Sequence, residues 1–409
     1  MVEAIREILS VLSTSKLRTA LTAASVAWGM FMLTLLLGAG RGLENGATWE
    51  FRDDAVQSIW IHTGQSTLPF AGHKPGRDVI LDESDYEAID QHVSGIEHKT
   101  GRFYLWGEFF VSRGAKRASF DVRGVHPGHR FLEKTQIVRG RYLNETDLGE
   151  QRKVAVIGNK VREILFGDEN PVGQRIQLRG QQYLVVGEFE DDGNDNEPRR
   201  IFIPVSVAQS AYRTPGRLHG LMFVLKSDDL TQSQIAEKKA VAFLQQRHQV
   251  HPDDKRAIRS QNSLESFRKV SEVFVWLNGF VWIVGIGTLF AAAIGVGNIL
   301  LISVAERTRE IGVRKALGAT SASIVTMIVT EGVMITTLAG YMGLVAGVGL
   351  VELVARNVKD VPFLREPSVD LRVAFAAAGS LVLAGVVASL VPALRAVRVD
   401  PIVALREGD

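Results

Sequence analysis

Four stretches of the chain are apolar over the length that a helix needs to cross a lipid bilayer. A bilayer core requires about 20 consecutive, mostly apolar helical residues, and residues 19–40, 273–305, 324–351 and 373–394 reach that length. Among these residues the only Asp, Glu, Lys or Arg is Glu331. Soluble helices of this length carry a polar face, and these stretches do not. The pattern therefore predicts four transmembrane helices instead of buried helices of a soluble protein.

The first apolar stretch is not typical of a cleaved signal peptide. It is too long, and a polar stretch of 18 residues precedes it. In that polar stretch, Ile5, Ile8, Leu9 and Leu12 have the spacing of one apolar stripe on a helix. We expect a short amphipathic helix on the cytoplasmic leaflet, with a plain extension of the first span as the alternative.

Basic residues near the ends of the apolar stretches predict the orientation, because Lys and Arg in short loops tend to stay in the cytoplasm. The short loop at 356–372 also contains basic residues, but acidic residues accompany them there. Four spans with both chain ends in the cytoplasm place residues 41–272 outside it. The cytoplasmic basic groups are Arg6, Lys16 and Arg18, then Arg307, Arg309, Arg314 and Lys315, then Arg395, Arg398 and Arg406.

The segment outside the cytoplasm has the sequence signals of a mixed α/β domain. Asp82 is expected to cap a helix that runs to about His92. The apolar spacing of Leu264, Phe267 and Val270 predicts that the second span continues outward as a stalk, and the first span is expected to continue likewise to Trp49. Strands are expected at 154–157 and 221–225, hairpins at 109–112 with 118–122 and at 176–178 with 183–186, and helices at 159–166 and 230–249.

Composition excludes several function classes. The net charge of +2 gives no sign of nucleic-acid binding, and the absence of Cys excludes disulfides and Cys-ligated metals. The sequence contains no P-loop pattern, no G-x-S-x-G and no H-E-x-x-H. His126 and His129 are spaced as H-x-x-H, but the Pro and Gly between them favour a turn over a metal site. The six acidic residues within 188–197 are interpreted as a solvated loop, with cation or partner binding as the alternative.

The connection between the second and third spans is the most informative stretch. Residues 306–319 read ERTREIGVRKALGA, with charges of alternating sign and an apolar side expected from Ile311, Val313, Ala316 and Leu317. A short helix lying across the inner membrane surface explains this order better than a solvated loop does. Glu331 follows inside the third span, where contact with water or an Arg favours a structural or coupling role over a proton relay.

This stretch, together with Glu331, strongly resembles the permease domain of the MacB/FtsX-like family, the type VII or mechanotransmission ABC transporters. Residues 16–19 (KLRT) resemble the family's entry into the first span, and residues 392–406 resemble its C-terminal signature. The outer segment contains VRGV at 122–125, GR at 140–141, VAVI at 154–157 and LFGDENPVG at 165–173. These motifs resemble the MacB-type periplasmic core domain.

The resemblance implies a non-catalytic permease subunit in the bacterial cytoplasmic (inner) membrane. Its fold class would be membrane α-helical, with four transmembrane helices and a large α+β extracytoplasmic domain. That domain would combine a porter-like part with an inserted β-rich part within about residues 112–222. The family motion would pass from a cytoplasmic coupling helix through the spans to the outer domain.

The resemblance also implies the partners. Two permease chains, identical or paralogous, would each rest on an ABC ATPase subunit, which gives two ATPase copies. ATP and Mg would bind to that ATPase, and this chain would hold no cofactor. The ATPase that is fused in MacB is not in this sequence, so a separate ATPase polypeptide is expected. A periplasmic adaptor, an outer-membrane channel and membrane lipid are further implied partners, and nucleic acid is not.

The coupling helix of the family gives the candidate site. Glu331 is assigned a structural or coupling role in the membrane. The residues assigned to ATPase coupling are Glu306, Arg307, Arg309, Glu310, Ile311, Gly312, Arg314, Lys315, Leu317, Gly318 and Ala319.

Three functions are compatible with this layout. Export or efflux driven by the ATPase is the leading hypothesis. A lipoprotein-releasing permease has the same four spans, and a transmembrane regulator of an extracytoplasmic enzyme would use the same motion. The expected domains are an amphipathic helix (1–17), first span and stalk (18–44), outer domain (45–262), stalk and second span (263–305), coupling helix (306–320), third span (321–355), outer loop (356–372), fourth span (373–394) and cytoplasmic tail (395–409).

Overall fold

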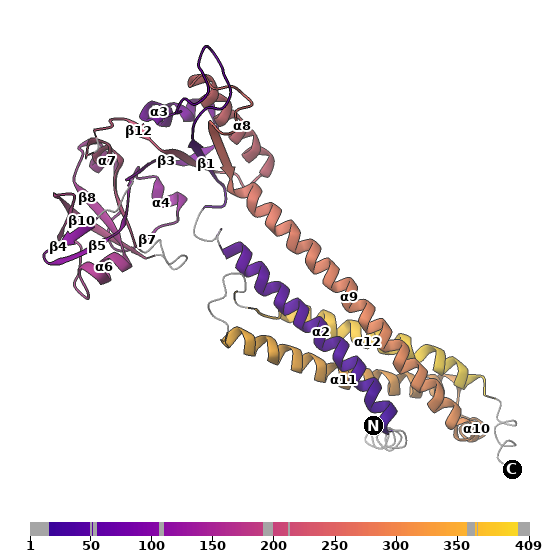
Figure 1. The fold of residues 1–409 in the computed structure, drawn as a ribbon. Coiled ribbons are helices and arrows are strands. Elements are labelled where there is room, and N and C mark those ends of the chain that lie inside the picture. Colours follow the sequence, from indigo (N-terminus) through magenta and orange to yellow (C-terminus); the bar gives the residue numbers. More distant parts are fainter. Residues whose placement is uncertain are drawn as a thin grey trace. The chain divides into compact units, whose positions relative to one another are not determined.

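The computed structural model describes residues 16–49, 51, 55–105, 110–190, 199–211, 213–357, 365 and 367–399. The chain forms two compact units, a membrane unit of Met1–Ala47 and Ser271–Asp409 and an outer unit of Thr48–Val270 (Figure 1). The predicted amphipathic helix before the first span and the family-like residues 400–406 lie outside the described residues.

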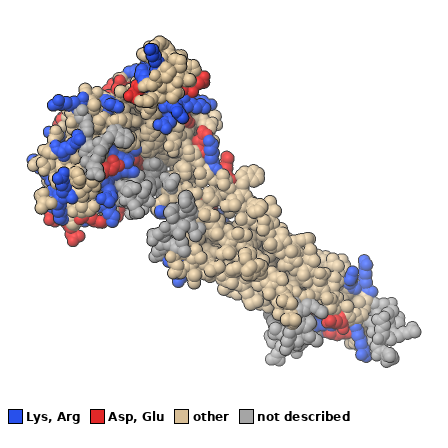
Figure 2. Space-filling model, in the orientation of Figure 1, with Lys and Arg blue, Asp and Glu red and all other residues tan. Residues whose placement is uncertain are grey.

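Four long helices dominate the membrane unit. Each is long and apolar enough to cross a bilayer, which confirms the four predicted spans. The face of this unit seen in Figure 2 shows hardly any Lys, Arg, Asp or Glu between its two ends, as expected for side chains in contact with lipid. The helices are α2 (Lys16–Trp49), α9 (Ser263–Glu306), α11 (Ser321–Asn357) and α12 (Leu371–Val397). Helices α2 and α9 are uninterrupted over the predicted stalk residues.

Glycines in α11 allow its neighbours to approach closely. A Cβ atom built on Gly343 would lie 2.9 Å from the carbonyl carbon of Ala27 in α2. One built on Gly340 would lie 2.9 Å from Leu381 Cδ1 in α12. Lipid tails are as apolar as the side chains, so helices in a membrane associate through such close packing and not through the hydrophobic effect. Buried residues from all four helices surround these contacts, among them Val26, Met30, Leu33, Val281, Leu289, Val296, Ala339, Ala377 and Leu381.

One part of the outer unit is a β-α-β-β-α-β arrangement. Its strands lie in the order β14-β1-β13-β3, and each neighbouring pair is antiparallel. This is a ferredoxin-like topology, and it is the porter-like part that the family resemblance implies. The elements in chain order are β1 (Ser58–Thr63), α3 (Glu83–His92), β3 (Ile96–Tyr104), β13 (Gly220–Leu225), α8 (Leu230–Arg247) and β14 (Ile258–Asn262).

Helix α3 begins where the sequence predicts. The Asp82 side chain accepts the backbone N–H of Asp85, and the Asp85 carboxylate accepts the backbone N–H of Asp82 at 2.8 Å. This is a capping box. The same carboxylate contacts Arg247 Nε at 2.9 Å and His248 Nε2 at 2.9 Å. One buried carboxylate therefore caps α3 and joins it to the end of α8.

The second part of the outer unit is inserted between β3 and β13. Strand β6 pairs with β3, so the insert extends the first part into one sheet, with twelve strands among the described residues. The strands of the insert in this sheet are β4 (Phe110–Arg113), β5 (Lys116–Ser119), β6 (Asp121–Val125), β7 (Gln136–Gly140), β8 (Val154–Gly158), β9 (Arg175–Leu178), β10 (Gln181–Glu190) and β11 (Arg200–Pro204). Its helices are α4 (His129–Leu132), α5 (Glu145–Gly149), α6 (Asn159–Leu165) and α7 (Val205–Ala211). The short strands β2 (Leu81–Asp82) and β12 (Arg217–Leu218) form a separate pair.

The local predictions for the insert are confirmed with one exception. Strand β8 and helix α6 follow each other as predicted, and β9 and β10 form the predicted hairpin. Its turn has φ of 50° at Arg179 and 81° at Gly180, the positive values that a two-residue hairpin turn needs. The predicted strand at 118–122 is wrong. It is split at the buried Phe120 because β5 pairs with β4, whereas β6 joins β3 and β11.

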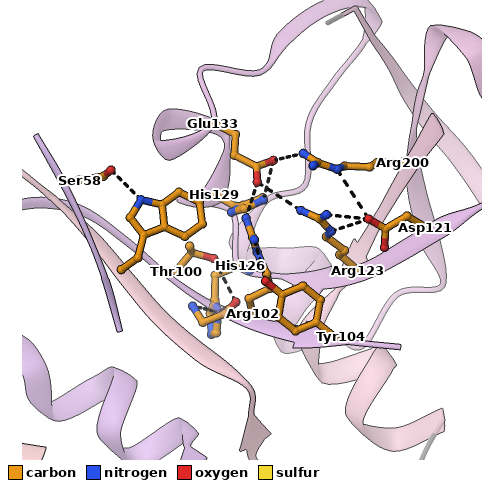
Figure 3. Close-up of polar contacts among 12 residues, drawn as sticks. Ser58, Thr100, Arg102, Tyr104, Asp121, Arg123, His126, His129, Glu133 and Arg200 are labelled. Atoms are coloured by element: carbon orange, nitrogen blue, oxygen red, sulfur yellow. Dashed lines mark hydrogen bonds and ion pairs between the residues drawn. The ribbon is translucent and has the colours of Figure 1, made fainter. Parts of the chain in front are cut away.

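A buried group of charges joins the two parts of the outer unit (Figure 3). Glu133, which directly follows α4, forms an ion pair with Arg102 of β3. Its carboxylate also lies 3.4 Å from Arg123 Nη1 of β6 and 3.5 Å from Arg200 Nη1 of β11. At the exposed edge of this group, Asp121 Oδ2 lies 2.7 Å from Arg123 Nη2. Buried charges are tolerated only when they are paired in this way, so the packing of the insert on the first part depends on these contacts.

The same contacts decide the protonation of two buried groups. Burial alone would raise the pKa of Glu133, but His129 and the arginines beside it outweigh burial and hold that pKa well below its usual range. Burial lowers the pKa of His129 to about 4, against the opposing effect of Glu133. At neutral pH the outer unit therefore holds an ionised Glu133 and an uncharged His129.

We expect Gly343→Ala to weaken the membrane unit. Alanine raises helix propensity by about 1 kcal/mol, but its methyl group would press against the Ala27 backbone, and such overpacking costs about 1–3 kcal/mol. A Cβ atom built on Gly349 of the same helix would meet nothing within 4 Å, so Gly349→Ala is the matched control. Thermal unfolding of the two variants in detergent should show a lower midpoint for Gly343→Ala only. Equal midpoints would contradict the close packing of α11 on α2.

We also expect the outer unit to lose stability as pH falls from about 6.5 towards 4. An unfolded His titrates near 6.5, whereas folded His129 titrates at about 4, so the unfolded state binds more protons in this window. Uncharged His129 makes its whole contribution to the free energy of unfolding above pH 6.5. Below pH 6.5 this contribution falls by up to roughly 1.4 kcal/mol per pH unit. His129→Phe should flatten this slope, measured by hydrogen exchange of β3 and β6 in the full chain. Measurement at pH 8, where His129 is uncharged in both states, controls for altered packing, and an unchanged slope would contradict the assignment.

Candidate functional site

Residues 306–319 form a short helix bounded by two turns. Helix α9 ends at Glu306, Arg307 leaves the helical conformation with φ of −104° and ψ of 15°, and α10 spans Thr308–Ala316. At its end the backbone N–H groups of Gly318 and Ala319 donate to the carbonyls of Lys315 and Arg314, each at 3.0 Å. Gly318 has φ of 96°, so this Schellman end needs a residue without a Cβ.

One face of α10 packs against the spans. Ile311 is only 2% exposed. It lies in an apolar cluster with Val304 of α9, Ile324 and Ile328 of α11, and Ala393 and Ala396 of α12. Gly312 beside it is also buried. Three of the four spans therefore meet on this face of the helix.

The opposite face of α10 is exposed. Val313 is 39% exposed and Leu317 is 83% exposed, with Ala316 exposed between them. The exposed Arg309 and Glu310 adjoin these apolar side chains. The expectation of one apolar side that includes Ile311 is therefore wrong. At 100° per residue, Ile311 lies on the opposite side of the helix from Val313, Ala316 and Leu317.

Charged side chains of α10 contact the ends of neighbouring spans. Lys315 Nζ donates to the carbonyl oxygens of Val397 at 2.6 Å and Val399 at 2.7 Å. Arg314 donates to Glu310 Oε1 at 2.8 Å and lies 3.1 Å from Met327 Sδ. The helix is thus held to the last turn of α12 and the first turns of α11.

Glu331 of α11 is 6% exposed, and its carboxylate lies 3.6 Å from Arg307 Nη1. Of the two partners expected for Glu331, water or an Arg, the structure shows an Arg. A pocket of about 10 Å³ adjoins the pair, lined by residues that include Ser303, Ile311 and Met327. That volume suits about one water molecule.

The structure divides the predicted site residues between the two faces. Arg307, Ile311, Gly312, Arg314 and Lys315 are buried or half-buried. Glu306, Arg309, Glu310 and Leu317 are exposed, and Gly318 and Ala319 make the turn into α11. The site prediction omitted Val313 and Ala316, although their angular positions beside Leu317 were available from the sequence. It also omitted Met327 and Val397, whose contacts no local pattern indicates.

The other candidate sites have structural roles. His126 Nδ1 accepts the backbone N–H of Gly101 at 2.9 Å, and its Nε2 contacts Glu83. His129 starts α4 after the predicted turn and belongs to the charge group of Glu133. The described residues contain no group of His, Asp and Glu suited to a metal ion.

The solvated-loop interpretation of the acidic stretch is wrong for its first two acidic residues, which lie in a strand, although Glu190 is exposed. Glu188 is 4% exposed in β10 and pairs with Arg162 at 2.7 Å and Arg139 at 3.3 Å. Residues 191–197 lie outside the described part of the chain.

Four spans, a large α/β domain between the first two, and a capped helix between the second and third define a multi-pass membrane protein. Residues 19–240 match the family model of the MacB-like periplasmic core domain, and residues 282–401 match that of the FtsX-like permease C-terminal region. The chain belongs to the MacB/FtsX-like family of ABC transporter permeases. It is an inner-membrane protein with a periplasmic domain.

Two similar proteins from other bacteria are longer than this chain. It is 29% identical to the macrolide export ATP-binding/permease protein MacB of Rhodospirillum rubrum, over 95% of this chain and 58% of that protein. It is also 29% identical to the pyoverdine export ATP-binding/permease protein PvdT of Pseudomonas entomophila, over 99% of this chain and 60% of that protein. The chain thus spans about three fifths of the length of these relatives.

Solved structures of isolated outer domains match the chain more distantly. The crystal structure of the periplasmic region of MacB from Actinobacillus actinomycetemcomitans gives a TM-score of 0.44 at 19% identity. The match covers 54% of this chain and 95% of that one.

We expect the buried face of α10 to hold the segment in place. Ile311→Ala removes apolar contacts at a cost of about 2–5 kcal/mol, so tryptic cleavage within residues 307–315 should become at least about tenfold faster. Val313→Ala, on the exposed face, is the matched control and should cleave at the wild-type rate. Equal cleavage of the two variants in detergent-solubilised full chain would contradict the packing of Ile311.

Proposed function

We propose that this chain is the permease subunit of an ABC exporter that converts ATP hydrolysis by a separate ATPase subunit into motion of its periplasmic domain. One observation carries the proposal. Helix α10 packs one face on three spans and exposes Val313, Ala316 and Leu317 on the other. A loop that only connects two spans does not require exposed apolar side chains on a rigidly packed helix. A helix that docks on a partner protein does require them.

The chemistry of that face suits a groove on another protein. Leu317 projects at the end of the helix, Val313 lies one turn before it, and Arg309 and Glu310 supply charges of both signs beside them. Apolar anchors inside a polar rim are the usual anatomy of a protein interface. The proposed occupant is the ABC ATPase, which would bind ATP and Mg and of which two copies would serve two permease chains.

The direction of transport is proposed from the relatives. MacB and PvdT are named for the export of macrolides and pyoverdine, and export is the function that we carry over to this chain. The lipoprotein-releasing and regulator hypotheses draw no support from those names. A periplasmic adaptor and an outer-membrane channel remain part of the proposal for export across two membranes.

We expect Leu317→Asp to disrupt the ATPase complex. The full chain would be tagged, expressed in its own host and purified in mild detergent, and the bound ABC ATPase quantified by mass spectrometry and by ATP hydrolysis. A carboxylate in an apolar groove is buried without a partner, and loss of a central anchor costs about 2 kcal/mol or more, so recovery should fall at least tenfold.

Leu317→Met is the matched control, because it keeps an apolar side chain of similar volume. It should recover the ATPase at the wild-type level. Equal ATPase recovery with Leu317→Asp would rule out this face as the docking surface. Absence of any ABC ATPase from the wild-type preparation would count against the proposed function as a whole.

A further inference from the structure

Both covalent connections of α10 are turns. Arg307 interrupts the helical conformation between α9 and α10, and Gly318 reverses the chain between α10 and α11. A continuous helix would pass a displacement directly along its axis, but a turn of one or two residues can absorb it by changing φ and ψ. Displacement of α10 therefore reaches the spans through side-chain contacts.

The apolar contacts of Ile311 are not sufficient to transmit a displacement of α10 to the spans. Apolar packing favours burial but has little directional preference. A helix held by it alone can slide or rotate over its neighbours. Contacts with a defined geometry are needed to fix α10 along and around its axis.

Lys315 provides one such contact. Its ammonium group donates to two carbonyl oxygens, those of Val397 and Val399, at 2.6 and 2.7 Å. Val397 is the last residue of α12, and Val399 follows the helix. The last carbonyls of a helix lack partners inside it, and the helix dipole makes this end negative. Lys315 is half-buried, so water screens the contact less than it would on the surface. It joins α10 to α12 across 82 positions of sequence.

Arg307 provides the other contact, at the opposite end of α10. Its guanidinium lies 3.6 Å from the carboxylate of Glu331, which is buried in α11. A carboxylate in a membrane span is costly without a partner, so Glu331 resists separation from Arg307. The two contacts lie at the two ends of one helix and lead to two different spans.

We propose that Arg307 and Lys315 are positioning residues that transmit the displacement of α10 to α11 and α12, respectively. The inference rests on the proposed function, since it takes the ATPase as the partner that moves α10. Neither residue belongs to the exposed face of Val313, Ala316 and Leu317. ATPase binding and transmission of movement are therefore separable by mutation.

The test compares binding with movement in the complete complex. The chain contains no Cys, so Lys239→Cys in α8 and Arg356→Cys at the end of α11, both exposed, would carry spin labels at defined positions. Labelled chain would be mixed with excess unlabelled chain, purified with the ATPase that binds the wild type, and placed in lipid nanodiscs. Distances between the labels would be measured without nucleotide and with ATP trapped by vanadate.

Arg307→Gln and Lys315→Gln should each bind the ATPase within about threefold of the wild type and lose at least half of the nucleotide-dependent distance change. Lys315→Arg keeps a charged donor and should restore the change. The double variant Arg307→Glu with Glu331→Arg should also restore the distance change, because the ion pair forms again with its charges exchanged. Arg398→Gln removes an exposed charge from the end of α12 and is the matched control.

The outcomes separate this inference from the proposed function. A full distance change in both Gln variants would overturn the inference and leave the proposed function intact. Loss of ATPase binding in those variants, to the level of Leu317→Asp, would also overturn it, because the residues would then serve docking. A wild type that binds the ATPase without any distance change would count against the proposed function itself.

Discussion

Close approach of helix backbones in the membrane unit is the constraint on which the rest of that unit depends. Lipid does not drive apolar helices together, so their association requires dense packing. Gly343 of α11 lets this helix approach the Ala27 backbone of α2, and Gly340 on another side leaves room for the Leu381 side chain of α12. A side chain at either position would separate helices that now touch. The spans therefore act as a packed group and not as four independent helices.

That packing gives α10 its support. Ile311 is inserted where α9, α11 and α12 meet at one end of the membrane unit. The exposed side chains of Val313 and Leu317 are held in position because the opposite face of their helix is fixed. The apolar and charged contacts have separate tasks in this arrangement. Burial of Ile311 holds α10 against the spans, whereas Arg307 and Lys315 define its register on them.

In the outer unit, paired charges hold the insert against the ferredoxin-like part. Its insert must pack on the ferredoxin-like part without a disulfide, because the chain contains no Cys. The group around Glu133 supplies directional contacts at this junction, from Arg102 of β3 and from Arg123 and Arg200 of the insert. Removal of one member leaves buried charge without its partner, which is far more costly than loss of a surface ion pair. The continuous sheet through β3 and β6 adds backbone hydrogen bonds to the same junction.

Much of this architecture was predictable because it is encoded locally. The length of the apolar stretches predicts the four spans. The capping residue Asp82 predicts the start of α3, and Arg179-Gly180 predicts a hairpin turn. The family resemblance of residues 306–319 gave the place of the candidate site. The predicted strand at 118–122 failed because its two halves pair with different strands, and pairing partners are not a local property.

The sequence by itself thus determined the spans, their orientation, most outer elements and the family. Only the tertiary structure decided which face of α10 is covered, which carbonyl oxygens accept from Lys315, and which arginines pair with Glu331 and Glu133. Ile311, Val313 and Leu317 are all apolar, and burial of one face follows from the neighbouring helices. Lys315 contacts Val397 across 82 residues. Local patterns report the conformation of a few turns, whereas these contacts depend on the packing of segments far apart in the chain.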